Sequence, residues 1–283
     1  MRRAEAVVPY ARLSWGPEAV VAPNRAPASF SARSATAALL GALLLLPATA
    51  VGADDADGFP RKKLDFHFQT PRASLGLRGG WAFNRSEGEI YDFLTELLTL
   101  DRNDFDAPAI AADFSWRLTS WMDVVFGFEW SGTESSSEFR DWVDQNGNPI
   151  EQDTRLDQVP LTVSLKLYPI GRGRQVGDYA WVRKPVVPYV GGGIGGTYYK
   201  LQQTGDFVDF VDLTIFEGDF SSEGFTFAQH VFAGFDFKLT RSLGLIVEGR
   251  YYWASADLEG DYIGFDPIDL DGARVMVGID WKL

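Results

Sequence analysis

Eight segments of this chain alternate apolar and polar side chains with a period of two. That period belongs to the β-strand, in which successive side chains point to opposite faces. An even number of such strands suits an antiparallel up-and-down barrel. We therefore predict an all-β fold, an eight-stranded antiparallel up-and-down barrel. The strands are expected at residues 73–83, 110–118, 124–131, 159–168, 188–199, 225–239, 243–253 and 273–283.

Alternation alone does not show which face of the strands meets water, because a soluble barrel or sandwich has the same period. Two features of the faces favour an apolar exterior in a membrane. The apolar face carries aromatic residues near the strand ends, as at membrane interfaces. The polar face is rich in glycine, which makes room in a narrow lumen. The aromatic girdle comprises Trp81, Trp116, Trp130, Tyr198, Tyr251, Trp253 and Trp281.

The connections also favour a transmembrane β-barrel. Short turns at 119–120 and 240–241 alternate with long polar segments at 84–107, 133–157, 200–224 and 255–271. Short turns on one side and long loops on the other are typical of membrane barrels. The connection 170–184 is longer than this pattern prefers. The soluble barrel or sandwich remains the alternative.

The N-terminal region has the parts of a secretory signal peptide. Arg25 and Arg33 precede the apolar run 37–46, and small residues follow at 47–50. As a helix this run would reach ~15 Å, about half of a bilayer core, so a permanent transmembrane helix fits less well. We predict a signal peptide with a long basic start at 1–53, a periplasmic tail at 54–71 and the barrel domain at 72–283.

Composition excludes several classes of chemistry. A net charge of −13 argues against nucleic-acid binding, which needs a basic face. The chain has no cysteine, so a thiolate metal site and a cysteine nucleophile are ruled out. Its two histidines, His67 and His230, are too few for a three-histidine metal centre. We expect no cofactor, no metal centre and no enzymatic activity, with His230 as a hydrogen-bonding residue of the lumen.

The polar face brings charges of both signs toward the barrel axis. Eight strands leave an interior that side chains can fill, so opposite charges are expected to pair across it. A general-diffusion porin needs about sixteen strands and is disfavoured. We predict a lumen plugged by a polar network, with a gated small-solute path as the alternative. The network comprises Arg78, Asp113, Arg117, Asp123, Glu129, Lys166, His230, Asp236, Glu248, Arg250, Arg274 and Asp280.

The long connections carry further signals. Acidic residues crowd 206–223 and 257–271, and carboxylates are ligands that divalent cations prefer. Calcium or magnesium bridging to lipopolysaccharide is one interpretation of these acids, and solvated negative loops are the other. Apolar residues at near-helical spacing in 90–100 predict a short amphipathic helix at the barrel mouth, which caps the lumen or contacts a partner. Asn146-Gly147 predicts a hairpin turn, with its two strands projecting beyond the lipid.

Three segments carry a family resemblance over residues 72–283. They are the glycine-rich 188–195, the stretch 247–252 and a closing strand with Trp281 near its end. With the export signal, the chain resembles the OmpA/OmpW-type eight-stranded outer-membrane barrels of Gram-negative bacteria. The usual final aromatic of that family is replaced here by Trp281-Lys282-Leu283. The resemblance implies a place in the bacterial outer membrane and membership of the wider porin family.

These observations together predict a non-enzymatic outer-membrane barrel with a structural or surface-interaction role. The alternative is a narrow or laterally opening channel for small, apolar solutes, as the OmpW resemblance implies. The expected partners are outer-membrane lipids, lipopolysaccharide and the barrel-assembly machinery, with divalent cations at the acidic loops.

Overall fold

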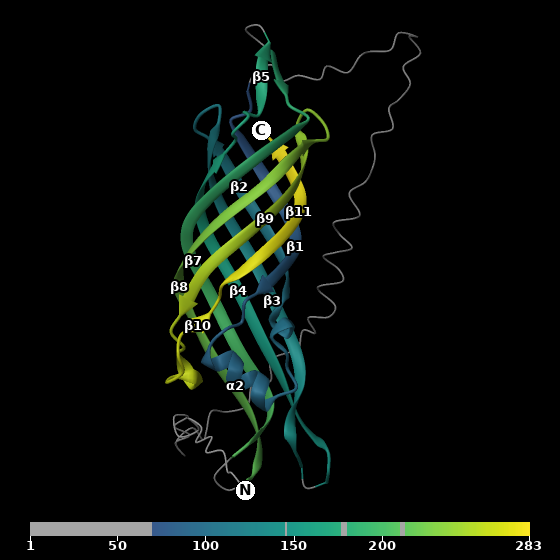
Figure 1. Cartoon of the computed structure of the whole chain (residues 1–283), viewed down its shortest axis with the longest axis vertical. Coiled ribbons are helices and arrows are strands. Elements are labelled where there is room, and N and C mark those ends of the chain that lie inside the picture. Colours follow the sequence, from purple (N-terminus) through teal and green to yellow (C-terminus); the bar gives the residue numbers. More distant parts are fainter. Residues whose placement is uncertain (1–69, 145, 177–179, 210–212) are drawn as a thin grey trace, which may run out of the picture. The chain divides into compact units, whose positions relative to one another are not determined.

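The computed structural model describes residues 70–144, 146–176, 180–209 and 213–283. Eight long antiparallel strands form a closed ring, in the order β1-β2-β3-β4-β7-β8-β9-β11, and β11 pairs again with β1 (Figure 1). The ring confirms the predicted eight-stranded up-and-down barrel. The predicted signal peptide lies outside the described residues, as does nearly all of the predicted tail. The ring strands are β1 (Ala73–Asn84), β2 (Ala107–Arg117), β3 (Met122–Val143), β4 (Pro149–Leu167), β7 (Val186–Val208), β8 (Ile215–Lys238), β9 (Leu243–Ala256) and β11 (Gly272–Lys282).

The outside of the ring is apolar over its middle part, which we call the apolar belt. Along each strand exposed apolar side chains alternate with buried polar or small ones. Burial therefore runs opposite to that of a soluble barrel, whose apolar side chains pack inside. None of the helices in the described ranges is long and apolar enough to cross a membrane. Exposed members of the belt include Leu75, Leu77, Ile110, Phe126, Phe128, Leu161, Val163, Leu165, Val190, Ile194, Val231, Phe235, Val247, Val275 and Val277.

Four neighbouring strands continue far beyond the belt at one end, here called the loop end. β3 with β4, and β7 with β8, stay paired almost to their connecting turns. We call residues 131–143, 149–158, 199–208 and 215–224 the extended wall. The expectation that 200–224 is a long loop was wrong, because most of it is a paired hairpin. Main-chain hydrogen bonds hold such a hairpin, although its side chains are polar on the outside.

The turn that joins β3 to β4 supports the hairpin expected from Asn146-Gly147. Gly147 has φ +84°, a left-handed conformation that favours glycine. Oδ1 of Asp144 accepts hydrogen bonds from the backbone amides of Asn148 at 2.7 Å and Asn146 at 2.8 Å. These bonds, that of Asn148 first, hold the pKa of Asp144 below its ordinary value. The turn is therefore fixed by its own polar atoms.

A second group of elements covers the loop end of the barrel. They are α2 (Glu89–Leu97), η2 (Arg102–Phe105), η3 (Gly260–Tyr262) and β10 (Ile268–Asp269). We call residues 85–106 and 257–271 the mouth cap. The spacing of apolar residues in 90–100 correctly predicted a helix, which is α2.

The opposite end, the short-turn end, carries a small hairpin. β5 (Gly173–Val176) pairs with β6 (Ala180–Arg183), and the pair projects beyond the ring at the top of Figure 1, near the C-terminus. We call residues 173–183 the short-turn hairpin. It accounts for the length of the 170–184 connection.

Close contact between neighbouring strands gives a first prediction. A Cβ at Gly80 would collide with the carbonyl oxygen of Val275 and lie 2.8 Å from Cα of Met276. Gly80→Ala should therefore lower the free energy of unfolding by about 1–3 kcal/mol, as overpacking does. Gly249→Ala is the matched control, because a Cβ there would meet nothing within 4 Å. Urea unfolding of the folded barrel measures both, and equal losses would contradict the packing described here.

Candidate functional site

The inward face of the ring gathers the charged residues that alternation assigned to it. All twelve residues of the predicted network are buried except Arg117, which is half-buried. They come from seven of the eight ring strands, β7 excepted. They form three clusters along the axis, described here from the middle outward.

Glu248 is the centre of the middle cluster. Its Oε2 accepts hydrogen bonds from Arg78 Nη1 at 2.7 Å and from Tyr189 Oη at 2.9 Å. Its Oε1 accepts one from Arg250 Nη2 at 2.8 Å. Arg78 pairs in addition with Asp113. One carboxylate thus joins groups from β1, β7 and β9, and the cluster spans the lumen.

Glu129 plays the same part in the cluster toward the loop end. It accepts hydrogen bonds from Arg274 Nε at 2.9 Å and from Tyr252 Oη at 3.1 Å. Arg274 also donates to Oε1 of Gln158 at 2.8 Å. Nη1 of Arg250 and Oε2 of Glu129 are 3.8 Å apart, so this cluster is continuous with the middle one.

The third cluster, toward the short-turn end, includes two residues that the sequence did not single out. Arg172 precedes the short-turn hairpin and Arg183 is its last residue, and both side chains reach acids of the ring strands. Arg172 Nη1 lies 2.6 Å from Asp123, and Arg183 pairs with Asp236. Both arginines belong to the connection 170–184, where no alternation of apolar and polar residues shows which side chains point into the ring. Asp123 and Asp236 lie near the ends of predicted strands and had no predicted cationic partner. This lack of a partner is the signal that could have pointed to the two arginines.

Lys282 completes this third cluster. Its Nζ lies 3.2 Å from Asp236 and also pairs with Asp280. Tyr168 Oη donates to Asp123 at 2.9 Å. The base of the short-turn hairpin therefore closes the lumen at this end with ion pairs.

Two other members of the predicted network have different partners. Lys166 Nζ lies 3.7 Å from the ring centroid of Tyr189, a cation–π contact. His230 Nε2 and Ser164 Oγ are 2.9 Å apart. His230 is only 2% exposed, and its Nδ1 makes no hydrogen bond to any described residue. A Ser-His nucleophile needs a third group that orients the base and a path for the substrate, and the described residues around His230 supply no such group.

The loop end is closed by an apolar core rather than by charges. Ile90, Tyr91 and Leu94 of α2 pack with inward residues of the extended wall, such as Leu156 and Leu201. The second half of the mouth cap contributes Leu258, Tyr262, Ile268 and Leu270. Tyr91 Oη donates to the carbonyl oxygen of Asp269 at 2.9 Å, and burial raises the pKa of Tyr91. The helix thus caps the lumen, the first of the two roles expected for it.

The predicted girdle residues lie on the outer face. Trp81, Trp130, Tyr198, Tyr251 and Trp253 sit toward the loop end, and Trp116 and Trp281 toward the short-turn end. Trp130 and Tyr251 are half-buried, and the others are exposed. In the described part of the chain no three acidic or histidine side chains converge as metal ligands would.

Fold and interior together define a closed eight-stranded barrel with an apolar exterior and an ion-paired lumen. No known family model matches the chain, and no curated protein does. Solved structures similar to it include outer-membrane and surface proteins. Identities and TM-scores are low, so the residues of this chain alone carry the functional interpretation. The similar structures include the outer membrane protein OprG from Pseudomonas aeruginosa (15% identity, 77% of this chain, 99% of that one, TM-score 0.41), a major outer membrane protein from Thermus thermophilus (10%, 75%, 99%, 0.42) and Neisserial surface protein A (9%, 75%, 96%, 0.39).

Proposed function

We propose that this chain is an outer-membrane β-barrel that acts as a closed structural or surface-interaction protein rather than as an open pore. One observation carries the proposal: buried ion pairs fill the lumen inside an apolar exterior. A charged interior and an apolar exterior are the reverse of what a water-soluble barrel needs.

The dimensions of the apolar belt fit a bilayer. On β1 the outward apolar residues run from Leu75 to Phe83, which matches the ~9–11 residues of a tilted transmembrane strand. Aromatic residues stand at both ends of the belt, where they would meet the lipid headgroups. Lipids of the outer membrane would then be the direct partners of the belt, and the barrel-assembly machinery would insert it.

The extended wall supports the surface role. Beyond Tyr198 and Phe225 the outward residues of β7 and β8 become polar, starting with Lys200 and Glu223. This face suits water and lipopolysaccharide rather than acyl chains. The acidic residues of the wall and of the mouth cap could be bridged to anionic lipopolysaccharide by divalent cations.

Conductance tests the closed lumen. In planar bilayers the folded protein should give no resolvable current steps, because three ion-paired clusters and the mouth cap block the axis. A sixteen-stranded porin provides the positive control. The anomalous migration of the unboiled protein on a gel verifies that the sample is folded before the measurement. Regular current steps from this folded protein would refute the closed lumen.

A second candidate function is a lateral path for small, apolar solutes, and the β3–β4 seam favours it. Pairing of these strands is interrupted at Glu129 and Trp130, opposite Val159 and Pro160. Proline has no N–H to donate to a ladder, so the seam is weaker here. A lateral conduit would speed the entry of an apolar solute into vesicles without producing an ionic current. A purely structural protein would change neither the rate of solute entry nor the current.

A further inference from the structure

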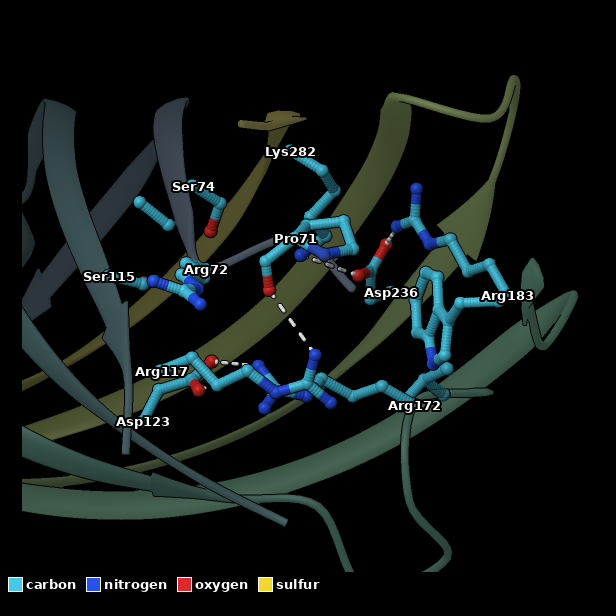
Figure 2. A pocket seen from close by; sticks show the side chains of 13 residues that line it. Pro71, Arg72, Ser74, Ser115, Arg117, Asp123, Arg172, Arg183, Asp236 and Lys282 are labelled. Carbon is cyan, nitrogen blue, oxygen red and sulfur yellow. Dashed lines mark hydrogen bonds and ion pairs between the residues drawn. The ribbon is translucent and has the colours of Figure 1, made fainter. Parts of the chain in front are cut away.

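A small cavity lies at the short-turn end, between the residues that precede β1 and the base of the short-turn hairpin (Figure 2). Its volume is about 20 Å³, which is room for about one water molecule or one oxygen of a larger group. Five cationic side chains line it: Arg72, Arg117, Arg172, Arg183 and Lys282.

The acids around this cavity are too few to neutralise these cations. Asp123 and Asp236 are the acids of its lining, and Asp280 pairs with Lys282 from just outside it. Five cations therefore face three side-chain carboxylates, while an oxygen of Leu283 accepts a hydrogen bond from the Arg72 amide at 3.1 Å. Asp123 is held by Arg172 at 2.6 Å, and Asp236 is shared between Arg183 and Lys282.

Two donor atoms of residues that line the cavity have no acceptor among the described residues. The side chain of Arg183 is only 2% exposed. Its Nη1 atom is buried and makes no hydrogen bond to any described residue. Nε of Arg172 is in the same state. A buried donor without a partner is costly, so such groups commonly mark the place of a ligand or water.

Arg117 adds a cation that no described carboxylate contacts. It donates only to the carbonyl oxygens of Pro71 and Thr119, both at 3.2 Å. Arg117 and Arg72 also line a shallow surface depression beside the cavity. The depression and the cavity share Arg72 and Arg117, so the positive charges of these two side chains favour an anion at this end of the barrel.

We propose that a phosphate-class oxyanion binds at this end of the barrel, with one oxygen in the cavity and the rest of the group in the adjoining depression lined by Arg72 and Arg117. Guanidinium groups present planar pairs of N–H donors that match the oxygens of phosphate better than a spherical halide. The phosphate could be a free ion or belong to a lipid headgroup at this end of the barrel. The proposal does not depend on whether the lumen conducts.

Calorimetry on the full-length chain in neutral detergent micelles tests the site. Inorganic phosphate should bind saturably at one site per chain, and chloride at the same ionic strength should not replace it. Arg117→Gln should weaken binding about tenfold, the effect of losing one charge-assisted hydrogen bond. Arg102→Gln is the matched control, since Arg102 lies in the mouth cap at the far end, and it should leave the affinity unchanged.

Arg183→Lys provides a second variant that keeps the charge beside Asp236 but removes the free Nη1 donor. It should also weaken phosphate binding, and gel migration of the unboiled protein shows whether each variant is folded. Phosphatidylglycerol added to the micelles separates the two sources. If phosphatidylglycerol competes with inorganic phosphate, the site binds a lipid headgroup. If phosphatidylglycerol does not compete, the site binds the free ion. No saturable phosphate binding, or affinity unchanged in both folded variants, would overturn the proposal.

Discussion

Glu248→Leu should lower the free energy of unfolding by about 3–5 kcal/mol, the cost of removing one partner from a buried charge cluster. Glu248 accepts hydrogen bonds from Arg78, Arg250 and Tyr189. Without Glu248, Arg78 keeps Asp113 as its carboxylate partner. Arg250 loses the carboxylate that is nearest to it. The apolar replacement cannot accept a hydrogen bond, so each of the two buried cations loses one of its carboxylate partners.

Glu134→Leu is the matched control for that substitution. Glu134 is exposed on the outer side of the extended wall, where a change typically costs within about 0.5 kcal/mol. Urea unfolding in lipid vesicles, followed by tryptophan fluorescence, measures both variants. Similar small losses would mean that water already solvates Glu248, and the closed lumen would then be wrong.

Val277→Arg should lower the free energy of unfolding by about 2–4 kcal/mol, the cost of an arginine that faces lipid at mid-bilayer. Val277 lies on the outer face of β11 and is 46% exposed. Its neighbours across the pairing are Gly79 and Val247, in the middle of the apolar belt. No carboxylate of the lumen can reach it, because the side chain points away from the axis.

Val143→Arg supplies the same chemical change outside the belt. Val143 ends β3 at the tip of the extended wall and is 62% exposed. In vesicles this substitution should leave the free energy of unfolding nearly unchanged. If Val277→Arg proved as mild as Val143→Arg, the apolar belt would not be in contact with acyl chains, and the outer-membrane proposal would fall with it.

Alternation was enough to predict the ring because inside and outside differ in polarity within the belt. Thus β11 alternates Arg274, Met276, Gly278 and Asp280 with Val275 and Val277. A one-residue slip in register would exchange the two sets. Wherever the two faces of a strand differ in polarity in this way, the sequence shows directly which side chains point into the ring.

The same signal fails in the extended wall. There Lys200, Gln202 and Thr204 alternate with Leu201 and Gln203, and this weak contrast did not reveal a strand. The outer side of the wall is polar, and its buried apolar residues gather on the inner side, where the mouth cap packs. Main-chain pairing, which leaves no mark on side-chain composition, extends the hairpin.

The third cluster, toward the short-turn end, shows a different limit of prediction from the sequence. Asp123 and Asp236 were assigned to the lumen from their strands, but their partners Arg172 and Arg183 lie in a connection. Only the return of that connection into the ring brings the opposite charges together. The pairing therefore depends on the path of the chain rather than on any local pattern.

The mouth cap has a consequence for the order of assembly. Tyr91 lies near the start of the barrel sequence, yet its hydroxyl donates to the main chain at Asp269, close to the last strand. Contacts between such distant parts form late, because the loop entropy must be lost first. The contact between Tyr91 and Asp269 therefore waits until the last hairpin has paired. Closure of the mouth cap would thus mark the end of barrel formation.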